Sequence, residues 1–232
     1  MNFRVIWDQP EACPYLPGQM ARLPLRVPPR RLTPVEFDEQ MALGDRRSGR
    51  LLYRTNCDAC TACEPLRVSI PNFVASKSQR RVWRKNVGEL RITSCLPVVD
   101  DLRLSLFNRH KLERGLSRSG EALTRESYAQ WLTHTCCQTV EVDYWEGDRL
   151  VAVSIVDLGE RSASSVYHYF DPDVSHRSLG VFSVLAEIAW LRQGGREWYY
   201  LGLYVEGCSH LVYKADYAPH ERLVGGVWVP TP

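Results

Sequence analysis

The sequence lacks any long apolar run. No segment approaches the ~20 consecutive apolar residues that a membrane-spanning helix requires. The first residues, MNFRVIWDQPEAC, are interrupted at Pro10 and fit neither a signal peptide nor a membrane anchor. We therefore expect a cytoplasmic protein whose partners do not include a membrane.

An excess of charge of one sign is also missing. The chain has 29 Lys and Arg residues against 27 Asp and Glu residues, a net charge of +2, so total charge says little about partners. Between residues 76 and 91, however, basic residues are opposed only by Glu89. This basic run contains Lys77, Arg80, Arg81, Arg84 and Lys85. A local basic patch on a nearly neutral protein indicates contact with a polyanion at one place. The alternative is the solvated face of a single element.

Internal repeats and low-complexity linkers are absent as well, and ordinary proportions of hydrophobic (44%) and charged (24%) residues predict a packed core. Prolines punctuate residues 10–34 and exclude long helices there. Residues 34–43 fit a short helix capped by Thr33, and residues 78–86 fit either a strand or a helix. The later patterns predict helices over 100–115 and 124–136, strands over 139–145, 150–158 and 164–170, a helix over 179–193, a strand over 198–205, a short helix over 208–216 and a strand over 224–229. This order indicates an α+β fold with two domains, residues 1–98 and residues 99–232.

Eight cysteines are not expected to form a disulfide framework in the cytoplasm. The spacing Cys57-x-x-Cys60-x-x-Cys63 allows three thiols to converge on one metal ion, either zinc or an iron–sulfur cluster. Zinc usually takes four ligands, and Cys13 is the first candidate for the fourth, with Cys95 next. The alternatives are a redox-active dithiol or packing without metal. The remaining cysteines, Cys136, Cys137 and Cys208, are expected to be buried.

The segment over residues 167–205 predicts a strand, a turn, a helix and a second strand. Asp171-Pro172-Asp173 ends the first strand, because proline cannot donate to the ladder. Arg177 and Ser178 then lie at the helix N-terminus, where free N–H groups attract anions. Acetyltransferase-like domains of the GNAT superfamily have this arrangement, with an acyl donor held between splayed strands. The alternative is that Ser178 only caps a core helix.

Five segments in order resemble one family, the bacterial aspartate/glutamate leucyltransferases within the arginyl-tRNA-protein transferases. The segments are CPYLPGQMARL (13–23), RRSGRLLYRTNCDACTACEPLRV (46–68), SKSQRRVWRKN (76–86), YHYFDPDVSHRSLGVFSVLAEI (167–188) and LGLYVEGCSHLVYKADYAPHERL (201–223). The resemblance covers nearly the whole chain. Each segment alone is weak, and the five in order are specific.

The resemblance implies a small cysteine-containing N-terminal domain followed by a GNAT-like domain. It also implies transfer of leucine from leucyl-tRNA to proteins that begin with Asp or Glu, which marks them for degradation. The polyanion at the basic run over residues 77–85 would then be the acceptor stem of the tRNA. Arginine is the other amino acid that members of the family transfer. The competing hypothesis is a non-catalytic RNA-binding module that a bound metal ion stabilises. Cys13 matches the first cysteine of a CxxC pair that eukaryotic relatives use for metal, but Leu16 stands at the second position.

An aminoacyl ester already stores the energy for transfer, so the chemistry needs no cofactor. The enzyme must position both substrates, accept a proton from the amine and stabilise an oxyanion. The candidate catalytic residues are His168, Tyr169 and Asp171, and the candidate substrate-binding residues are Arg46, Arg47, Arg177, Ser178, Tyr204 and Lys214. An arginine pairs well with an acidic N-terminal side chain because guanidinium binds carboxylate through two parallel hydrogen bonds. Tyrosines such as Tyr167, Tyr169 and Tyr204 are expected to line the donor pocket.

Overall fold

An eight-stranded mixed sheet organises most of the chain. The computed structural model describes residues 1–117 and 119–231. The sheet has the order β14-β13-β7-β12-β11-β10-β9-β8. Its strands are β7 (Cys63–Ser69), β8 (Arg91–Cys95), β9 (Gln138–Glu146), β10 (Arg149–Leu158), β11 (Ser162–Phe170), β12 (Trp198–Val205), β13 (His220–Val224) and β14 (Val227–Thr231). The predicted α+β class is confirmed.

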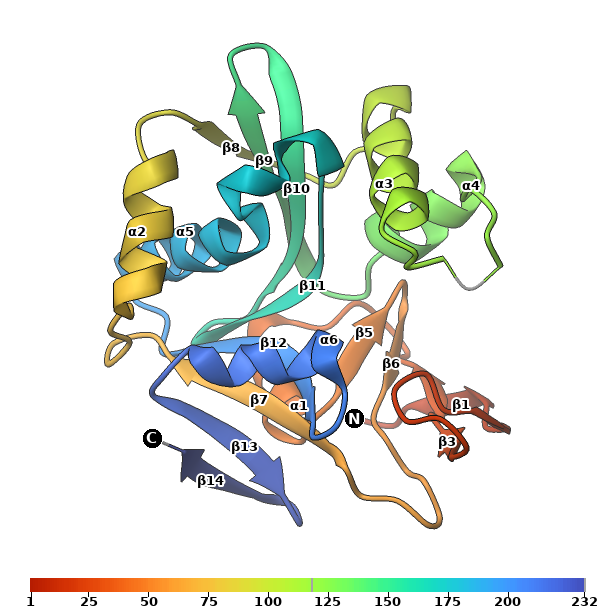
Figure 1. Cartoon of the computed structure of the whole chain (residues 1–232). Helices are drawn as coiled ribbons and strands as arrows, with labels where there is room; N and C mark the ends of the chain where they lie inside the picture. The colour runs from red at the N-terminus through yellow and green to blue at the C-terminus, as the bar shows by residue number, and fades with distance from the viewer. Residues whose placement is uncertain (118, 232) are drawn as a thin grey trace.

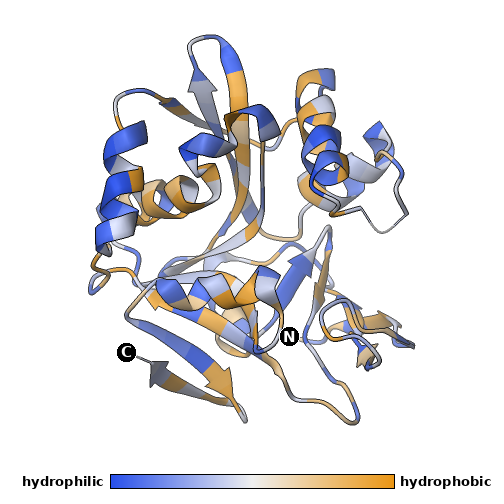
Figure 2. Cartoon of the chain, in the orientation of Figure 1, coloured by the Kyte–Doolittle hydropathy of each residue, from blue (hydrophilic) through white to orange (hydrophobic). Residues whose placement is uncertain are grey.

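Helices cover both faces of the central strands. Helices α2 (Lys77–Asn86) and α5 (Leu179–Gln193) lie on one side of β9, β10 and β11, and α3 (Asp101–Glu113) and α4 (Arg125–Tyr128) lie on the other (Figure 1). Consequently β10 is apolar and buried at nearly every position, whereas the outer turns of α2 and α3 are hydrophilic (Figure 2). A strand that is covered on both faces reads as a continuous apolar run rather than an alternating one.

The pairing of β11 with β12 creates the central opening of the fold. These strands are parallel and joined by α5, but they pair only between residues 162–164 and residues 198–200. Beyond that point β11 continues beside β10, whereas β12 continues beside β7. The two strands therefore diverge over the start of α5, as expected for an acetyltransferase-like core.

Side-chain caps fix the starts of two N-terminal helices. In α1 (Pro34–Ala42), Thr33 accepts from the backbone of Glu36, whose side chain accepts from Thr33 N–H. In α2, Ser76 and Gln79 form the same reciprocal pair. Each capping box satisfies two N–H groups that the helix cannot bond. It also explains why residues 78–86, which fit either element by pattern, are helical.

The sequence pattern was wrong at three places. The segment before residue 64 forms short strands that its prolines did not indicate, namely β1 (Arg4–Trp7), β2 (Pro10–Ala12), β3 (Met20–Arg22), β4 (Leu25–Val27) and β5 (Arg46–Ser48); β6 (Leu51–Tyr53) lies within residues 50–54, where the pattern does predict a strand. The helix expected over 124–136 shortens to α4 followed by a π-helical turn, Ala129–Thr133. The strand expected over 224–229 is a hairpin, because Gly225 and Gly226 adopt positive φ and turn the chain from β13 into β14.

The predicted division after residue 98 cuts through the large sheet. Strand β7 lies between β12 and β13, and β8 forms the edge beside β9. Helix α2 also packs on α5. The two parts of the chain therefore share one sheet.

In the described residues, no helix is both long and apolar enough to cross a membrane.

Candidate active site

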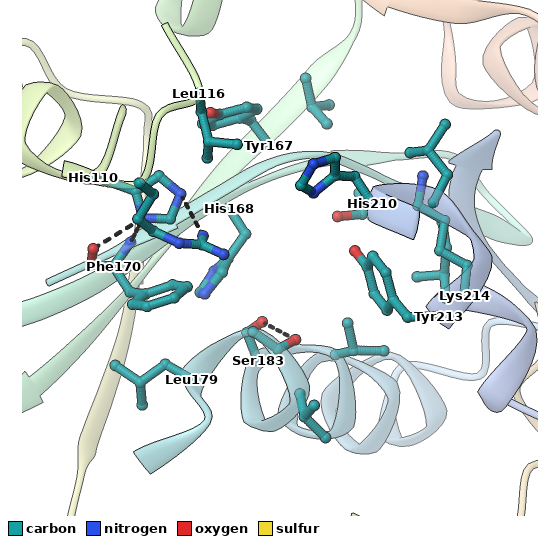
Figure 3. Close-up of a pocket in the computed structure, with 18 of the residues that line it drawn as sticks. His110, Leu116, Tyr167, His168, Phe170, Leu179, Ser183, His210, Tyr213 and Lys214 are labelled. Carbon is teal, nitrogen blue, oxygen red and sulfur yellow. Dashed lines mark hydrogen bonds between the residues drawn. The ribbon is translucent and has the colours of Figure 1, made fainter. Parts of the chain in front are cut away.

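A cavity of about 610 Å³ lies where β11 and β12 diverge (Figure 3). Its walls come from β11, β12, the start of α5, the end of α3 and the segment over residues 210–214, which follows β12. That segment contains the helix α6 (Ser209–Val212) and continues into a 3-10 turn, Tyr213–Asp216. Elements far apart in the sequence thus contribute to one concave site, which is the usual form of a ligand-binding site.

The cavity lining combines basic and aliphatic side chains. The basic side chains lining it are Arg46, Lys111, Arg114 and Lys214, and the aliphatic ones include Leu179, Val181, Val184, Leu201, Leu203 and Leu211. Among the described residues that line it, none is Asp or Glu. Such a lining favours a ligand that is anionic in one part and apolar in another.

Arg46 presents an unpaired donor to this cavity. The side chain comes from β5, and its Nη1 is buried without a hydrogen-bond partner. Tyr53, opposite it on β6, forms a side-chain hydrogen bond to the guanidinium. Gly202 of β12 makes room for the guanidinium, because a Cβ there would lie 1.8 Å from Nη1. A buried donor without a partner costs about 1–3 kcal/mol, which an incoming carboxylate would offset.

Lys214 is a second buried cation at the same wall. Only 8% of the residue is exposed, and its Nζ donates to the Leu203 carbonyl at 2.9 Å. Burial, together with the nearby Arg46 charge, lowers the pKa of Lys214 to about 7. The ammonium is therefore charged below neutral pH and loses its charge above it.

If proteins that begin with Asp or Glu are the acceptors, as the sequence resemblance implies, this titration predicts a pH-dependent preference for them. The charge on Lys214 is present below pH 7, so the kcat/KM ratio of an Asp-start peptide to an Asn-start peptide falls about fivefold from pH 7 to pH 8. Deprotonation of the peptide amine affects both peptides and cancels in the ratio. In Lys214→Arg the ratio stays level, because guanidinium keeps its charge. A wild-type ratio as flat as that of the variant would contradict this role.

His110 and Arg114 form a third part of the lining. His110 Nδ1 contacts the Phe170 carbonyl at 3.0 Å, and Arg114 Nη1 donates to Nε2 at 3.2 Å (Figure 3). Arg114 also lies over the Phe170 ring, 4.7 Å from its centre. Burial lowers the pKa of His110 to about 4, so a neutral imidazole holds the guanidinium at the cavity.

The start of α5 also lines the cavity. Ser178 has φ 55°, a left-handed conformation that is uncommon outside glycine, and its side chain makes no capping hydrogen bond. Leu179, Gly180 and Val181 follow it along the wall. The first N–H groups of the helix are therefore available to an anion.

His168 lies beside this helix start. Its Nδ1 is 2.8 Å from Ser154 Oγ, and its Nε2 is buried without a hydrogen-bond partner. Burial lowers the pKa of His168 to about 3, so the ring is neutral at physiological pH. Of the predicted catalytic residues, His168 alone lines the cavity.

The other two predicted catalytic residues have structural partners. Tyr169 is fully buried, and its hydroxyl is 2.6 Å from that of Tyr128. Asp171 is 3% exposed, pairs with Arg149 and Arg109, and accepts from the Asp173 N–H at 3.0 Å. Tyr169 is therefore a core residue, and Asp171 closes the turn after β11.

Three predicted substrate-binding residues also lie outside the cavity lining. Arg177 forms an ion pair with Glu146 of β9. Arg47 is buried against Asp157, with 2.6 Å between Nε and Oδ2. Tyr204 packs under a guanidinium, that of Arg222, 4.7 Å from the ring centre. Arg46, Ser178 and Lys214 remain, and the structure brings them together with His168 and with Tyr167, which also lines the cavity.

Several lining residues were not singled out in the sequence, namely Tyr15, His110, Arg114, His210 and Tyr213. His110 and Arg114 are four residues apart on α3, a spacing that puts them on one helix face. This spacing was the only feature of the sequence that could have linked the two residues. It gave no indication that their face of α3 would be directed at β11.

The predicted tRNA-contacting run lies on the outer face of α2. Lys77, Arg80, Arg81, Arg84 and Lys85 are all exposed, whereas Val82 and Trp83 pack toward α5. Arg80 donates to the Ala75 carbonyl, and Lys85 donates to the His176 carbonyl at 2.6 Å. The helix therefore presents a solvent-facing basic surface.

The cysteines predicted to bind metal are close neighbours but do not form a closed ligand set. Burial and the thiols of Cys13, Cys57, Cys60 and Cys208 raise the pKa of Cys63 to about 12. Among the residues that the structure describes, the one group whose ligand atoms lie within 4.8 Å of one another is a different one. It consists of Cys95, Glu141 and Asp143, and Arg103 already pairs with both carboxylates.

The diverging strands over the start of α5, with a basic and apolar cavity between them, give this protein the acetyltransferase-like fold. Two family descriptions match the sequence: "Arginine-tRNA-protein transferase, N terminus" over residues 11–81, and "Arginine-tRNA-protein transferase, C terminus" over residues 103–224. The chain belongs to the arginine-tRNA-protein transferase family and is a transferase.

Curated relatives agree with this assignment. An aspartate/glutamate leucyltransferase of Vibrio cholerae is 33% identical over 216 residues, which cover 93% of this chain and 92% of the relative. One of Acinetobacter baumannii is 34% identical over 221 residues, which cover 94% and 81% of the two chains.

Solved structures match less closely. The C-terminal domain of a putative lysylphosphatidylglycerol synthetase from Agrobacterium fabrum has a TM-score of 0.48 at 13% identity, covering 62% of this chain and 47% of that one. A tandem GNAT protein of clavulanic acid biosynthesis has a TM-score of 0.44 at 13% identity, covering 90% and 58%. Likeness at this level says nothing about what this chain binds.

Proposed function

We propose that this enzyme transfers leucine from leucyl-tRNA to the N-terminal Asp or Glu of proteins, as the names of its relatives suggest. The observation that carries the proposal is the lining of the cavity, which is cationic and aliphatic and, in its described residues, free of carboxylates. An arginyl donor would bring a guanidinium that needs an acidic partner there. A leucyl side chain needs only apolar surface.

The reaction is aminolysis of an ester. The α-amino nitrogen of the acceptor protein attacks the leucyl carbonyl carbon, a C–N bond forms, and the C–O bond to the tRNA ribose breaks. One proton leaves the nitrogen and one proton joins the departing ribose oxygen. Because the ester is activated, no cofactor takes part in this balance.

The cavity supplies a group for each requirement of this reaction. In this proposal Arg46 and Lys214, which line the cavity, bind the acidic side chain of the acceptor. The N–H groups of Leu179 and Gly180, at the start of α5, stabilise the oxyanion. His168 Nε2 is a neutral proton acceptor at the same wall. The hydrocarbon residues then take the leucyl side chain.

A labelled transfer assay tests this function. Purified protein is incubated with leucyl-tRNA or arginyl-tRNA and with peptides that begin with Asp, Glu or Ala. We expect label from leucyl-tRNA to enter only the acidic-start peptides. Label from arginyl-tRNA instead would overturn the donor assignment. Transfer from neither charged tRNA, by protein that is folded and binds tRNA, would favour the non-catalytic RNA-binding module.

The use of charged tRNA as donor implies a cytoplasmic enzyme.

We also propose that the basic surface of α2 contacts the tRNA backbone. Replacing Lys77, Arg81 and Arg84 by Ala is expected to weaken binding and to flatten its salt dependence by about 0.7–0.9 in the log–log slope for each phosphate that is no longer neutralised. The readout is filter binding of tRNA at several salt concentrations. Transfer to peptide at saturating leucyl-tRNA, where a weakened contact no longer limits the rate, controls for damage to the cavity. An unchanged slope would refute the contact.

The thiol cluster supports a separate proposal, that Cys13, Cys57, Cys60 and Cys63 hold a structural zinc ion or iron–sulfur cluster. Cys13 Sγ and Cys57 Sγ each accept a backbone N–H at 3.4 Å, from Leu16 and Arg22 respectively, as thiolate ligands often do. A cation among these thiols would counteract the burial and the neighbouring thiols that together raise the pKa of Cys63. Elemental analysis and visible absorption of anaerobically purified protein test it. A metal content well below one ion per chain after reconstitution would count against it.

A further inference from the structure

A polar network extends from the cavity into the core behind His168. Ser154 on β10 lies directly opposite His168 on β11 in the antiparallel register. The hydroxyl of Ser154 contacts Nδ1 at 2.8 Å, on the side of the ring away from the unpartnered Nε2. The network therefore reaches His168 through one ring nitrogen and leaves the other for the cavity.

The network ends at a buried glutamate. Glu187 on α5 is 2% exposed. The Tyr144 hydroxyl donates to its Oε1 at 3.1 Å, and the Tyr199 hydroxyl donates to its Oε2. Burial raises the pKa of Glu187, whereas hydrogen bonds from Ser154, Tyr199 and Tyr144 act against that rise. Three hydroxyls from three strands thus converge on one carboxylate.

The positions of the protons follow from this geometry. An ionised carboxylate only accepts hydrogen bonds, and burial keeps the phenols of Tyr144 and Tyr199 protonated by raising their pKa. If Ser154 gives its single proton to the Glu187 carboxylate, with which it shares a hydrogen bond, its oxygen accepts from His168 and Nδ1 carries the imidazole proton. Nε2, which has no partner in the protein, then keeps its lone pair free.

We propose that Ser154 and Glu187 are positioning residues that hold His168 in the Nδ1–H tautomer, with Nε2 ready to accept a proton from the attacking amine. This role rests on the proposed aminoacyl transfer. As the C–N bond forms, the positive nitrogen gives one proton to Nε2. The imidazolium returns that proton to the ribose oxygen when the C–O bond breaks, so the enzyme ends in its starting state.

The low basicity of a buried imidazole is compatible with this step. The amine becomes far more acidic once it has bonded to the carbonyl carbon, so a weak base suffices to remove its proton. The ring then passes the proton to an alkoxide, which is a much stronger base. Because burial lowers the pKa of His168, solvent does not protonate the ring before substrate arrives.

Nitrogen NMR of the full chain labelled with ¹⁵N-histidine tests the tautomer without any assay of activity. His168 is assigned by the disappearance of its signals in His168→Gln. We expect the wild-type spectrum to have Nδ1 in the protonated shift range and Nε2 in the unprotonated range. In Ser154→Ala the preference for Nδ1–H disappears, and in Ser154→Thr, which keeps the hydroxyl, it returns. Ser183→Ala removes a hydroxyl from the same cavity wall, one that donates to Gly180 O, and leaves the tautomer unchanged.

Kinetics test the link to catalysis. Ser154→Ala and Glu187→Gln are expected to lower kcat by about 100-fold, within the range of general-base effects, with KM for aminoacyl-tRNA and peptide changed less than about twofold. The amide introduced by Glu187→Gln brings two N–H donors where the carboxylate has none, so the hydroxyls around it must rearrange. Restoration of kcat in Ser154→Thr together with the tautomer would support the proposal.

Two outcomes would overturn it. A wild-type Nε2–H tautomer would contradict the proton positions, and a kcat that survives loss of the Nδ1–H tautomer would contradict the role of Nε2 as base. A wild type with the Nδ1–H tautomer but without transfer from any aminoacyl-tRNA would overturn the proposed function and the base role with it, while the hydrogen-bond network would stand. The failures are therefore distinguishable.

Discussion

Replacing Arg46 by Met lowers kcat/KM for Asp-start and Glu-start peptides by about 150-fold, because removal of one partner of a buried charge pair costs about 3 kcal/mol. The same change alters kcat/KM for an Ala-start peptide much less. The physical reason is that Arg46 Nη1 has no protein partner in the cavity wall, so its hydrogen-bonding capacity is left for substrate. The readout is the transfer assay with the three peptides under single-turnover conditions.

The control for this prediction is Arg50→Met. Arg50 is exposed and belongs to the same hairpin of β5 and β6, so its loss removes a charge from that hairpin without emptying the cavity. Arg46→Lys should retain part of the acidic preference, because an ammonium keeps the charge and loses the two-pronged geometry. An equal loss for acidic-start and Ala-start peptides would mean that Arg46 supports the cavity and does not read the carboxylate.

Replacing Arg47 by Met has its large effect on stability. Arg47 and Asp157 pair with side chains that are 1% exposed, and Thr139 donates to the same carboxylate at 2.6 Å. Removing the guanidinium leaves a buried carboxylate without its partner and lowers the free energy of unfolding by about 3–5 kcal/mol. Urea denaturation followed by circular dichroism measures it.

A double variant separates pairing from packing at this position. In Arg47→Met with Asp157→Leu, no buried charge is left unpaired, so most of the lost stability should return. If Arg47→Met alone costs less than about 1 kcal/mol, water or another cation compensates Asp157. The contrast with Arg46 is instructive because the two arginines are adjacent in sequence. Alternation along β5 directs one to the cavity and the other into the core.

The local patterns predicted most elements of the second half. Strands β9, β10, β11 and β12 and helix α5 lie where apolar runs and turn residues put them. The predicted site residues that lie away from the cavity have partners far away in sequence. The hydroxyl of Tyr169, on strand β11, contacts that of Tyr128, on helix α4. Arg177, in the turn before α5, forms an ion pair with Glu146 of β9.

The candidate site was predictable only in part for the same reason. Ser178 and Lys214 could be found because each lies in a distinctive segment. The position of His110 depends on where α3 docks, and the space for the Arg46 guanidinium depends on Gly202, which is far from it in the chain. Pairing and burial between residues so far apart in the sequence produce no periodic pattern that a single sequence would reveal.

The position of β7 has a consequence for how the chain is made. Residues 63–69 pair with residues 198–205 on one side and with residues 220–222 on the other. A strand synthesised early must therefore wait, without its neighbours, until the ribosome has delivered nearly the entire polypeptide. Such non-local pairing is a slow step, since a long loop must close before the contacts can form. During translation the cysteine-containing loop over residues 57–63 and β7 are therefore exposed to chaperones, oxidants and metal ions until the neighbouring strands pair with β7.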